Sequence, residues 1–116
     1  MRINQLNPQP TECVSFERTM FWKVPQVAGC YILATSSGDI LYIGQTKDLY
    51  KRIRDHLNDP QKTDPTPEGT ASHFCYFECP EEKLQELESS WVDLFKAIHG
   101  KLPILNTINP PYNQHW

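Results

Sequence analysis

Two short apolar segments with a polar turn between them lie near the middle of the chain. Residues 29–35 and 40–44 are rich in β-branched and aromatic side chains, and residues 36–39, Ser-Ser-Gly-Asp, have the composition of a turn. Strand-length apolar segments joined by a short glycine-containing connection are typical of a β-hairpin. The sequence therefore predicts two paired antiparallel strands over residues 29–44.

The spacing of apolar residues changes directly after this hairpin. Leu49, Ile53 and Leu57 recur at intervals of four, which places them on one face of a helix. We therefore expect an amphipathic helix over residues 47–58, with Thr46 or Asp48 as its N-cap.

A second helical pattern follows a proline-rich segment and a third strand. Residues 58–71 hold three prolines and a glycine among polar residues, so they are expected to form an exposed loop, and residues 72–78 read as a strand. Pro80 opens the second helix, which extends to about Gly100. Its apolar stripe consists of Leu84, Leu87, Trp91, Leu94, Phe95 and Ile98.

The order β-β-α-β-α predicts a small α+β fold, one sheet with helices packed against it. Residues 1–116 are expected to form a single domain. Residues 1–27 are predicted to be an N-terminal arm on the core, with room for one short strand or helical turn. The end of the chain, with Pro103, Pro110 and Pro111, is expected to be an irregular tail.

The distribution of charge restricts where a nucleic acid could bind. The formal net charge is −3, which argues against a broad basic face, because Lys and Arg supply most of the affinity for a polyanion. Positive charge is nevertheless concentrated in Lys47, Lys51, Arg52 and Arg54. A small basic site is therefore predicted there, with Lys47, Lys51 and Arg54 as candidate nucleic-acid contacts.

No apolar segment approaches the length of a membrane span, and the N-terminus lacks the apolar stretch of a signal peptide. We therefore expect a soluble, cytoplasmic protein without a membrane partner. A delivered effector would show the same composition.

The four cysteines allow three interpretations. Two disulfides would suit a secreted protein, and His73, Cys75 and Cys79 supply three potential zinc ligands without a convincing fourth. Buried free thiols in a reducing compartment are the expected state.

The predicted hairpin brings two tyrosines together. If residues 36–39 form the loop, Tyr31 faces Gly44 and Leu33 faces Tyr42, so the two phenols are diagonal neighbours on one face. Gly44 lacks a side chain, which would leave space for a ligand beside Tyr31. Ordinary strand aromatics would give the same sequence.

Polar residues on the two helices complete a candidate site. Arg52 and His56 are four residues apart and share a helix face, an arrangement that suits a phosphate or a solvated charged surface. Glu88 has Leu84 and Trp91 as helical neighbours, so its carboxylate points toward the interior side and requires a cation or a hydrogen-bonding partner. An ion pair with Arg52 or Arg54 would also meet that requirement.

The same residues resemble the motifs of the GIY-YIG endonuclease superfamily. Five elements occur in the family's order across a motif core of residues 25–106. They are Gly29-Cys30-Tyr31, Tyr42-Ile43-Gly44, Arg52 with His56, Leu87-Glu88-Ser89-Ser90-Trp91-Val92, and Pro103-Ile104-Leu105-Asn106. Cys30 stands where the family usually has isoleucine.

The resemblance implies a three-stranded antiparallel sheet flanked by helices, and a metal-dependent phosphodiester hydrolase. Glu88 would bind one Mg²⁺ or Mn²⁺ ion. Tyr31 or Tyr42, aided by His56, would orient or deprotonate the attacking water, and Arg52 would neutralise charge in the transition state.

The remaining implied residues are structural. Asn106 would hold the site together by hydrogen bonds, and Gly29 and Gly44 would keep its floor narrow.

The functional prediction is therefore a divalent-metal-dependent DNA endonuclease. The excess of acidic over basic residues predicts that the chain alone binds DNA weakly or in a structure-selective way, or that a protein partner supplies the affinity. A non-catalytic nucleic-acid-binding or protein-interaction module on the same fold is the alternative.

Overall fold

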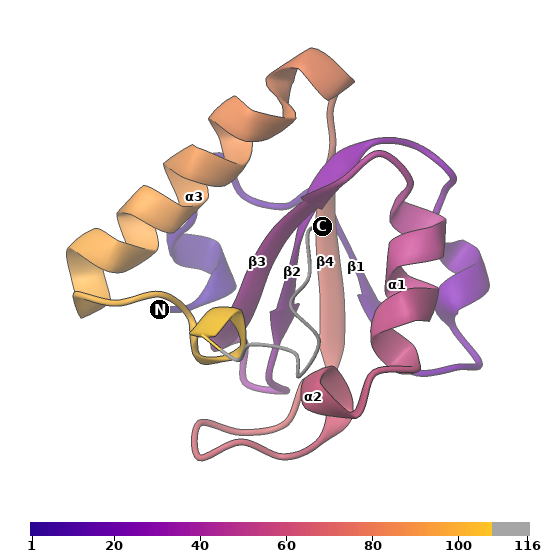
Figure 1. The fold of residues 1–116 in the computed structure, drawn as a ribbon, viewed down its shortest axis with the longest axis horizontal. Helices are drawn as coiled ribbons and strands as arrows, with labels where there is room; N and C mark the ends of the chain where they lie inside the picture. Colours follow the sequence, from indigo (N-terminus) through magenta and orange to yellow (C-terminus); the bar gives the residue numbers. More distant parts are fainter. Residues whose placement is uncertain (108–116) are drawn as a thin grey trace.

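The computed structural model describes residues 1–107 and contains one antiparallel sheet with the strand order β1-β4-β2-β3 (Figure 1). Its strands are β1 (Glu12–Ser15), β2 (Gly29–Ala34), β3 (Ile40–Thr46) and β4 (His73–Glu78). The predicted α+β class with an antiparallel sheet is confirmed. The predicted irregular C-terminal end is described only in part: Pro103 is followed by a 3₁₀ turn over Ile104–Thr107, and Pro110 and Pro111 lie outside the described residues.

The expectation of three strands is wrong, because the N-terminal arm adds a fourth. Strand β1 pairs with β4 at the edge of the sheet, with Val14 opposite Phe74. It is four residues long and half-exposed. A strand this short carries little apolar periodicity of its own, and its pairing with β4 is set by a contact between distant segments.

The helices follow the predicted pattern with shifted ends. They are α1 (Leu49–Leu57), α2 (Pro60–Thr63) and α3 (Leu84–His99), with 3₁₀ turns η1 (Ile3–Gln5), η2 (Phe21–Lys23), η3 (Glu81–Lys83) and η4 (Ile104–Thr107). Asp48 is the N-cap of α1, and its side chain accepts a hydrogen bond from the Lys51 amide at 3.1 Å. Gly100 ends α3 in the left-handed conformation, with φ of 73°.

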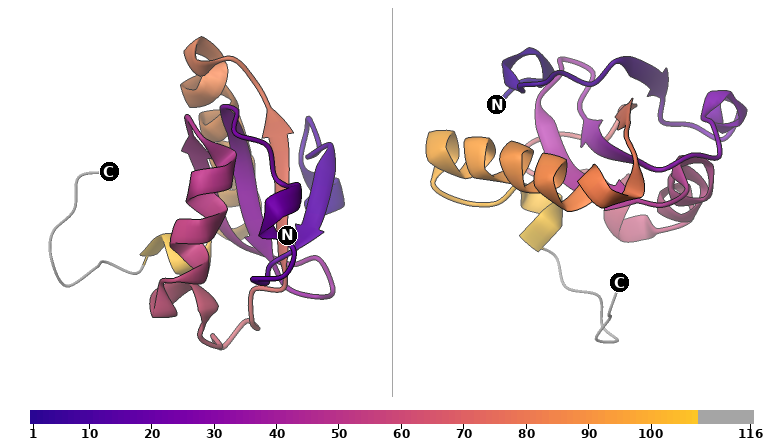
Figure 2. Two further views of the ribbon diagram at one scale, coloured as in Figure 1. Left: turned by 90° about the vertical axis from the view of Figure 1, so that its right-hand side faces the viewer. Right: turned by 90° about the horizontal axis from the view of Figure 1, so that it is seen from above.

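The helices lie on the two faces of the sheet. Figure 2 shows α3 and the N-terminal turn on one side, and α1 with η2 on the other. Beneath α1, buried side chains such as Tyr31, Leu49 and Phe74 form one core cluster. Beneath α3, Ile32 and Trp91 belong to a second cluster. Strands β2 and β4 are buried between these layers, whereas β3 is an edge strand.

The hairpin has the predicted register where the tyrosines lie. Tyr31 is opposite Gly44, and Leu33 is opposite Tyr42. The register then shifts at a bulge, so Ala34, rather than Thr35, pairs with Ile40. Because the shift comes after Leu33, both phenols keep the α1 face, and their ring centroids are 5.9 Å apart.

The expectation that all four cysteines are free thiols is wrong for one pair. Cys13 on β1 is disulfide-bonded to Cys75 on β4, while Cys30 and Cys79 are free. The Cys75 sulfur is therefore committed to a covalent bond, so the zinc set of His73, Cys75 and Cys79 loses one of its three ligands. The disulfide joins β1, the short strand of the N-terminal arm, covalently to β4.

No helix within residues 1–107 is long and apolar enough to cross a membrane. The cytoplasmic location stays a prediction.

Candidate active site

A hydrogen bond between β2 and α1 lies at the centre of the predicted site. The Tyr31 hydroxyl lies 2.7 Å from Nε2 of His56, and both side chains are buried. Burial, reinforced by the charges of Lys62 and Arg52, lowers the pKa of His56 to about 3. His56 is therefore a neutral ring at ordinary pH, able either to accept the Tyr31 proton or to donate to the Tyr31 oxygen according to its tautomer.

Gly44 has a different role from the one expected. A Cβ atom at this position would lie 2.6 Å from the Tyr31 hydroxyl oxygen and 2.9 Å from a ring carbon of Tyr42. The space that the missing side chain leaves is thus filled by the two phenols themselves, not by a ligand. Tyr31 is 0% exposed, whereas Tyr42 is half-buried and closer to solvent.

Arg52 extends from the same flank of α1 as His56. It is half-buried, and it makes no ion pair in the part of the chain that the structure describes. Its positive charge opposes the effect of burial, which raises the pKa of both Tyr31 and Tyr42. Arg52 is therefore near enough for its charge to act on both phenols, and within residues 1–107 no acidic side chain pairs with it.

Glu88 reaches the same strand from α3. Its Oε1 accepts a hydrogen bond of 2.9 Å from Nε2 of Gln45 on β3, and its side chain is half-buried. Its negative charge contributes to the raised pKa of Tyr42. Within residues 1–107 Glu88 pairs with neither Arg52 nor Arg54, so the ion-pair alternative is wrong for these residues.

Asn106 binds the exposed edge of β3. Its Oδ1 accepts from the Ile43 amide, and its Nδ2 donates to the Ile43 carbonyl, both at 2.9 Å. The side-chain amide thus replaces a neighbouring strand at the residue between Tyr42 and Gly44.

Lys62 was missed by the sequence reasoning, which placed it in an exposed loop. It is 7% exposed on α2, and its ammonium lies 3.5 Å from an Asp59 oxygen and 5.1 Å from the Tyr42 ring centroid. The signal that could have found it is Asp59-Pro60, a capping residue followed by a proline suited to the first turn of a helix. Lys62 and Asp59 are then three residues apart on that turn.

The other predicted residues lie around this centre. A Cβ atom on Gly29 would lie 2.6 Å from the Phe77 carbonyl oxygen and 2.8 Å from a methyl carbon of Leu49. Gly29 therefore allows α1 to pack closely on β2 and does not contact the tyrosines. Lys47 and Lys51 are exposed in weak ion pairs with acidic neighbours, at 3.9 and 3.8 Å, and Arg54 lies on aromatic rings on the opposite flank of α1.

The structure thus brings together two phenols, a buried neutral imidazole, a guanidinium without an ion pair in residues 1–107, and a carboxylate, groups that can orient a water and stabilise negative charge. Comparison with known proteins specifies the family. Residues 27–102 match the GIY-YIG catalytic domain, and the chain belongs to that family. The predicted enzyme class, a GIY-YIG-type endonuclease, is thereby confirmed.

Curated relatives carry the same domain. The chain is 35% identical over 57 residues to UvrABC system protein C of Methanosphaera stadtmanae, and 38% identical over 48 residues to that of Methanosarcina acetivorans. The UvrABC system protein C of Mycoplasmoides gallisepticum is 38% identical to the chain over 37 residues. These alignments cover 48%, 41% and 32% of this chain but only 10%, 9% and 6% of the relatives. The similarity is thus to one small part of much longer proteins.

Proposed function

We propose that this chain is a divalent-metal-dependent endonuclease that hydrolyses phosphodiester bonds in DNA at the edge of β3. The main support is the buried hydrogen bond between Tyr31 and His56, with Arg52 and Glu88 close enough for their charges to act on the same phenols. Burial of two phenols and an imidazole that contact one another needs a functional reason, because a purely apolar set would fill the same core without the cost of desolvating polar groups.

In the proposed mechanism the buried pair positions the phenols. Tyr42, the more exposed phenol, orients the attacking water, whose proton leaves to solvent, and the fully buried Tyr31 is held by its hydrogen bond to the neutral His56 ring. The pKa of about 3 keeps His56 neutral, which makes the ring a hydrogen-bond partner and a poor proton acceptor. Arg52 neutralises charge that develops on the phosphate oxygens.

Glu88 would hold the ion, Mg²⁺ or Mn²⁺. No group of three or more His, Cys, Asp or Glu within residues 1–107 forms a metal cage, so the donor set is one carboxylate. That set fits Mg²⁺, which is commonly bound through one or two carboxylates and keeps several waters. When bound, such an ion supplies Lewis-acid stabilisation of charge on the phosphate. The Gln45 amide fixes the orientation of the Glu88 carboxylate.

The first experiment replaces Glu88 by glutamine. The amide oxygen of Glu88→Gln can still accept from Gln45, so the fold should be retained while the charge is lost. We expect Mg²⁺- or Mn²⁺-dependent nicking of plasmid DNA to disappear. The matched control is Glu86→Gln, an exposed acid on the same helix, paired at 3.6 Å with Lys83.

A readout independent of cleavage separates metal binding from other roles. Paramagnetic Mn²⁺ held by Glu88 should broaden the side-chain amide NMR signals of Gln45 in the wild type and in Glu86→Gln, but not in Glu88→Gln. Wild-type nicking by Glu88→Gln would show that the metal assignment is wrong. Retention of DNA by a wild-type protein that never cuts would favour the non-catalytic binding module instead.

A further inference from the structure

A surface of aromatic and basic side chains lies beside α1, outside the site described above. We call it the η2–α1 surface and define it by Arg18, Phe21, Trp22, Lys23, Tyr50 and Arg54. Turn η2 packs against α1 (Figure 1), and it precedes the part of the chain that matches the family, residues 27–102. The family match therefore covers Tyr50 and Arg54 of this surface but not its four residues at and before η2.

Trp22 is the most exposed large apolar side chain within residues 1–107, at 65%. It is nevertheless held in place, because its indole nitrogen donates to the Thr19 carbonyl at 2.9 Å. The Lys23 ammonium lies 5.7 Å from its ring centroid. An ordered, solvent-facing indole with a cation beside it has one face available to a planar group.

Arg54 extends the pattern across to α1. Its guanidinium carbon lies 5.5 Å from the Tyr50 ring centroid and 6.0 Å from that of Phe21. Arg18 donates at 3.4 Å to the Leu57 carbonyl at the end of the same helix. Each of the three aromatic rings thus has a cation near it, which differs from the continuous apolar patch that a protein partner would favour.

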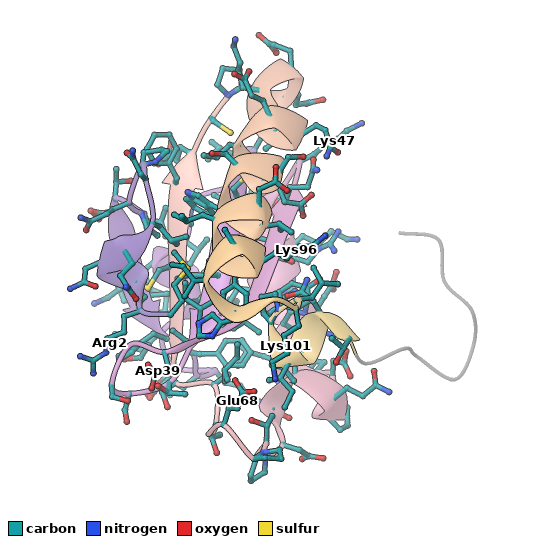
Figure 3. The ribbon with its side chains drawn as sticks, turned by 90° about the vertical axis from the view of Figure 1, so that its left-hand side faces the viewer. Arg2, Asp39, Lys47, Glu68, Lys96 and Lys101 are labelled. Carbon is teal, nitrogen blue, oxygen red and sulfur yellow. A yellow bond between two sulfur atoms is a disulfide. The ribbon has the colours of Figure 1, made fainter. Side chains whose placement is uncertain are left out.

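The distribution of unpaired charge supports an anionic partner. Six of the eleven Lys and Arg residues are in ion pairs within residues 1–107. In the same range, the five without one are Arg18, Lys23, Arg52, Arg54 and Lys96. Lys96 lies away on α3 (Figure 3), and Arg52 belongs to the active site. The other three are the cations of the η2–α1 surface, in a chain whose net charge is −3.

Position relative to the active site completes the argument. Arg54 lies two residues beyond Arg52, about 200° around the helix, and a helix with its side chains is about 10–12 Å across. Stacking on aromatic rings, with nearby positive charge, is how proteins bind unpaired bases.

We propose that the η2–α1 surface binds an unpaired segment of the DNA substrate by stacking a base on Trp22. The inference rests on the proposed endonuclease function and narrows its substrate to DNA with a single-stranded segment next to a duplex.

The test measures binding without cleavage. Fluorescein-labelled duplex, blunt or with a five-nucleotide single-stranded tail, is titrated with full-length protein in EDTA, and anisotropy gives the dissociation constant. We expect the tail to tighten wild-type binding at least about fivefold, the lower end for stacking one base on an aromatic ring. Trp22→Ala should remove this advantage and leave blunt-duplex binding unchanged, whereas Trp22→Phe should keep most of it.

The control is Ile98→Ala, which truncates another exposed apolar side chain, 49% exposed and on α3; it should behave as the wild type. Contact is checked directly, because tailed DNA should quench indole emission in the wild type and much less in Trp22→Phe. A tail advantage that persists in Trp22→Ala, or is absent in the wild type, overturns the proposal. A protein that binds tails through Trp22 but never cuts with Mg²⁺ or Mn²⁺ refutes the proposed function and leaves this inference standing.

Discussion

The burial of His56 predicts that the stability of the fold depends on pH. The native pKa is about 3, below the ordinary value of 6.5, so the unfolded chain takes up a proton at His56 below pH 6.5 while the native protein does not. The free energy of unfolding therefore falls as the pH falls from 6.5 toward 3. One pKa unit corresponds to about 1.4 kcal/mol, which makes the loss attributable to His56 about 2 kcal/mol at pH 5.

The assay is urea unfolding at pH 7.5 and pH 5 of the wild type and of His56→Gln, whose amide can still hydrogen-bond the Tyr31 hydroxyl. Carboxyl groups titrate alike in both proteins, so the difference between their pH responses isolates His56. We expect the wild type to lose about 2 kcal/mol more than His56→Gln over this interval. His73→Gln, on the half-buried end of β4, is the control and should follow the wild type.

An equal loss in the wild type and in His56→Gln would refute the reasoning. It would mean that His56 is protonated in the native state at pH 5 and is not the buried neutral ring on which the proposed hydrogen bond to Tyr31 rests.

Four further predictions test the surroundings of the site. Asn106→Ala should lower the free energy of unfolding, measured in urea, by about 1–3 kcal/mol, because two hydrogen bonds to Ile43 are lost at about 0.5–1.5 kcal/mol each. An unchanged free energy of unfolding would show that Asn106 does not stabilise β3. Tyr42→Phe should slow single-turnover cleavage about 10²–10⁴-fold at an unchanged melting temperature. A wild-type rate would show that the Tyr42 hydroxyl has no part in cleavage and that the ring only packs. Tyr31→Phe should in addition lose about 1–3 kcal/mol of stability, because it leaves a buried imidazole nitrogen without its partner, so a variant of unaltered stability would contradict that hydrogen bond. Lys62→Met should raise the pKa of the neighbouring histidine, followed by NMR titration, because a positive charge that opposes protonation is removed; no change would show that the ammonium does not act on the ring.

The parts of the fold that the sequence predicted are those set by local patterns. The alternation of side chains fixed the face of Tyr31 and Tyr42, and the bulge that the pattern could not reveal comes after them in the hairpin. The sequence offered Thr46 or Asp48 as the N-cap of α1, and Asp48 is the residue whose side chain accepts from a helix amide. Glu88 has apolar neighbours on its own helix, and this local pattern predicted that its side chain is half-buried.

The parts that were missed depend on contacts between distant segments. Strand β1 exists because it pairs with β4 and is bonded to it through Cys13 and Cys75, which are 62 residues apart. Gln45 is 43 residues from Glu88, so no local pattern could name it as the partner. Lys62 is buried against the general tendency of lysine to be exposed, and only the ion pair and the aromatic ring that it meets make that burial tolerable.

The position of β3 at the edge of the sheet explains why the site forms there. Successive side chains of a strand point to opposite faces, so Tyr42 and Gly44 face α1 while Gln45 faces α3, where it meets Glu88. Groups on opposite faces of a central strand are separated by the sheet, but around an edge strand both can approach one phosphate. An open edge would also invite pairing with another strand, and Asn106 prevents this at Ile43 by occupying both of its backbone groups. The edge is thus closed to strand addition at the residue between Tyr42 and Gly44, while the side chains around it remain accessible to a substrate.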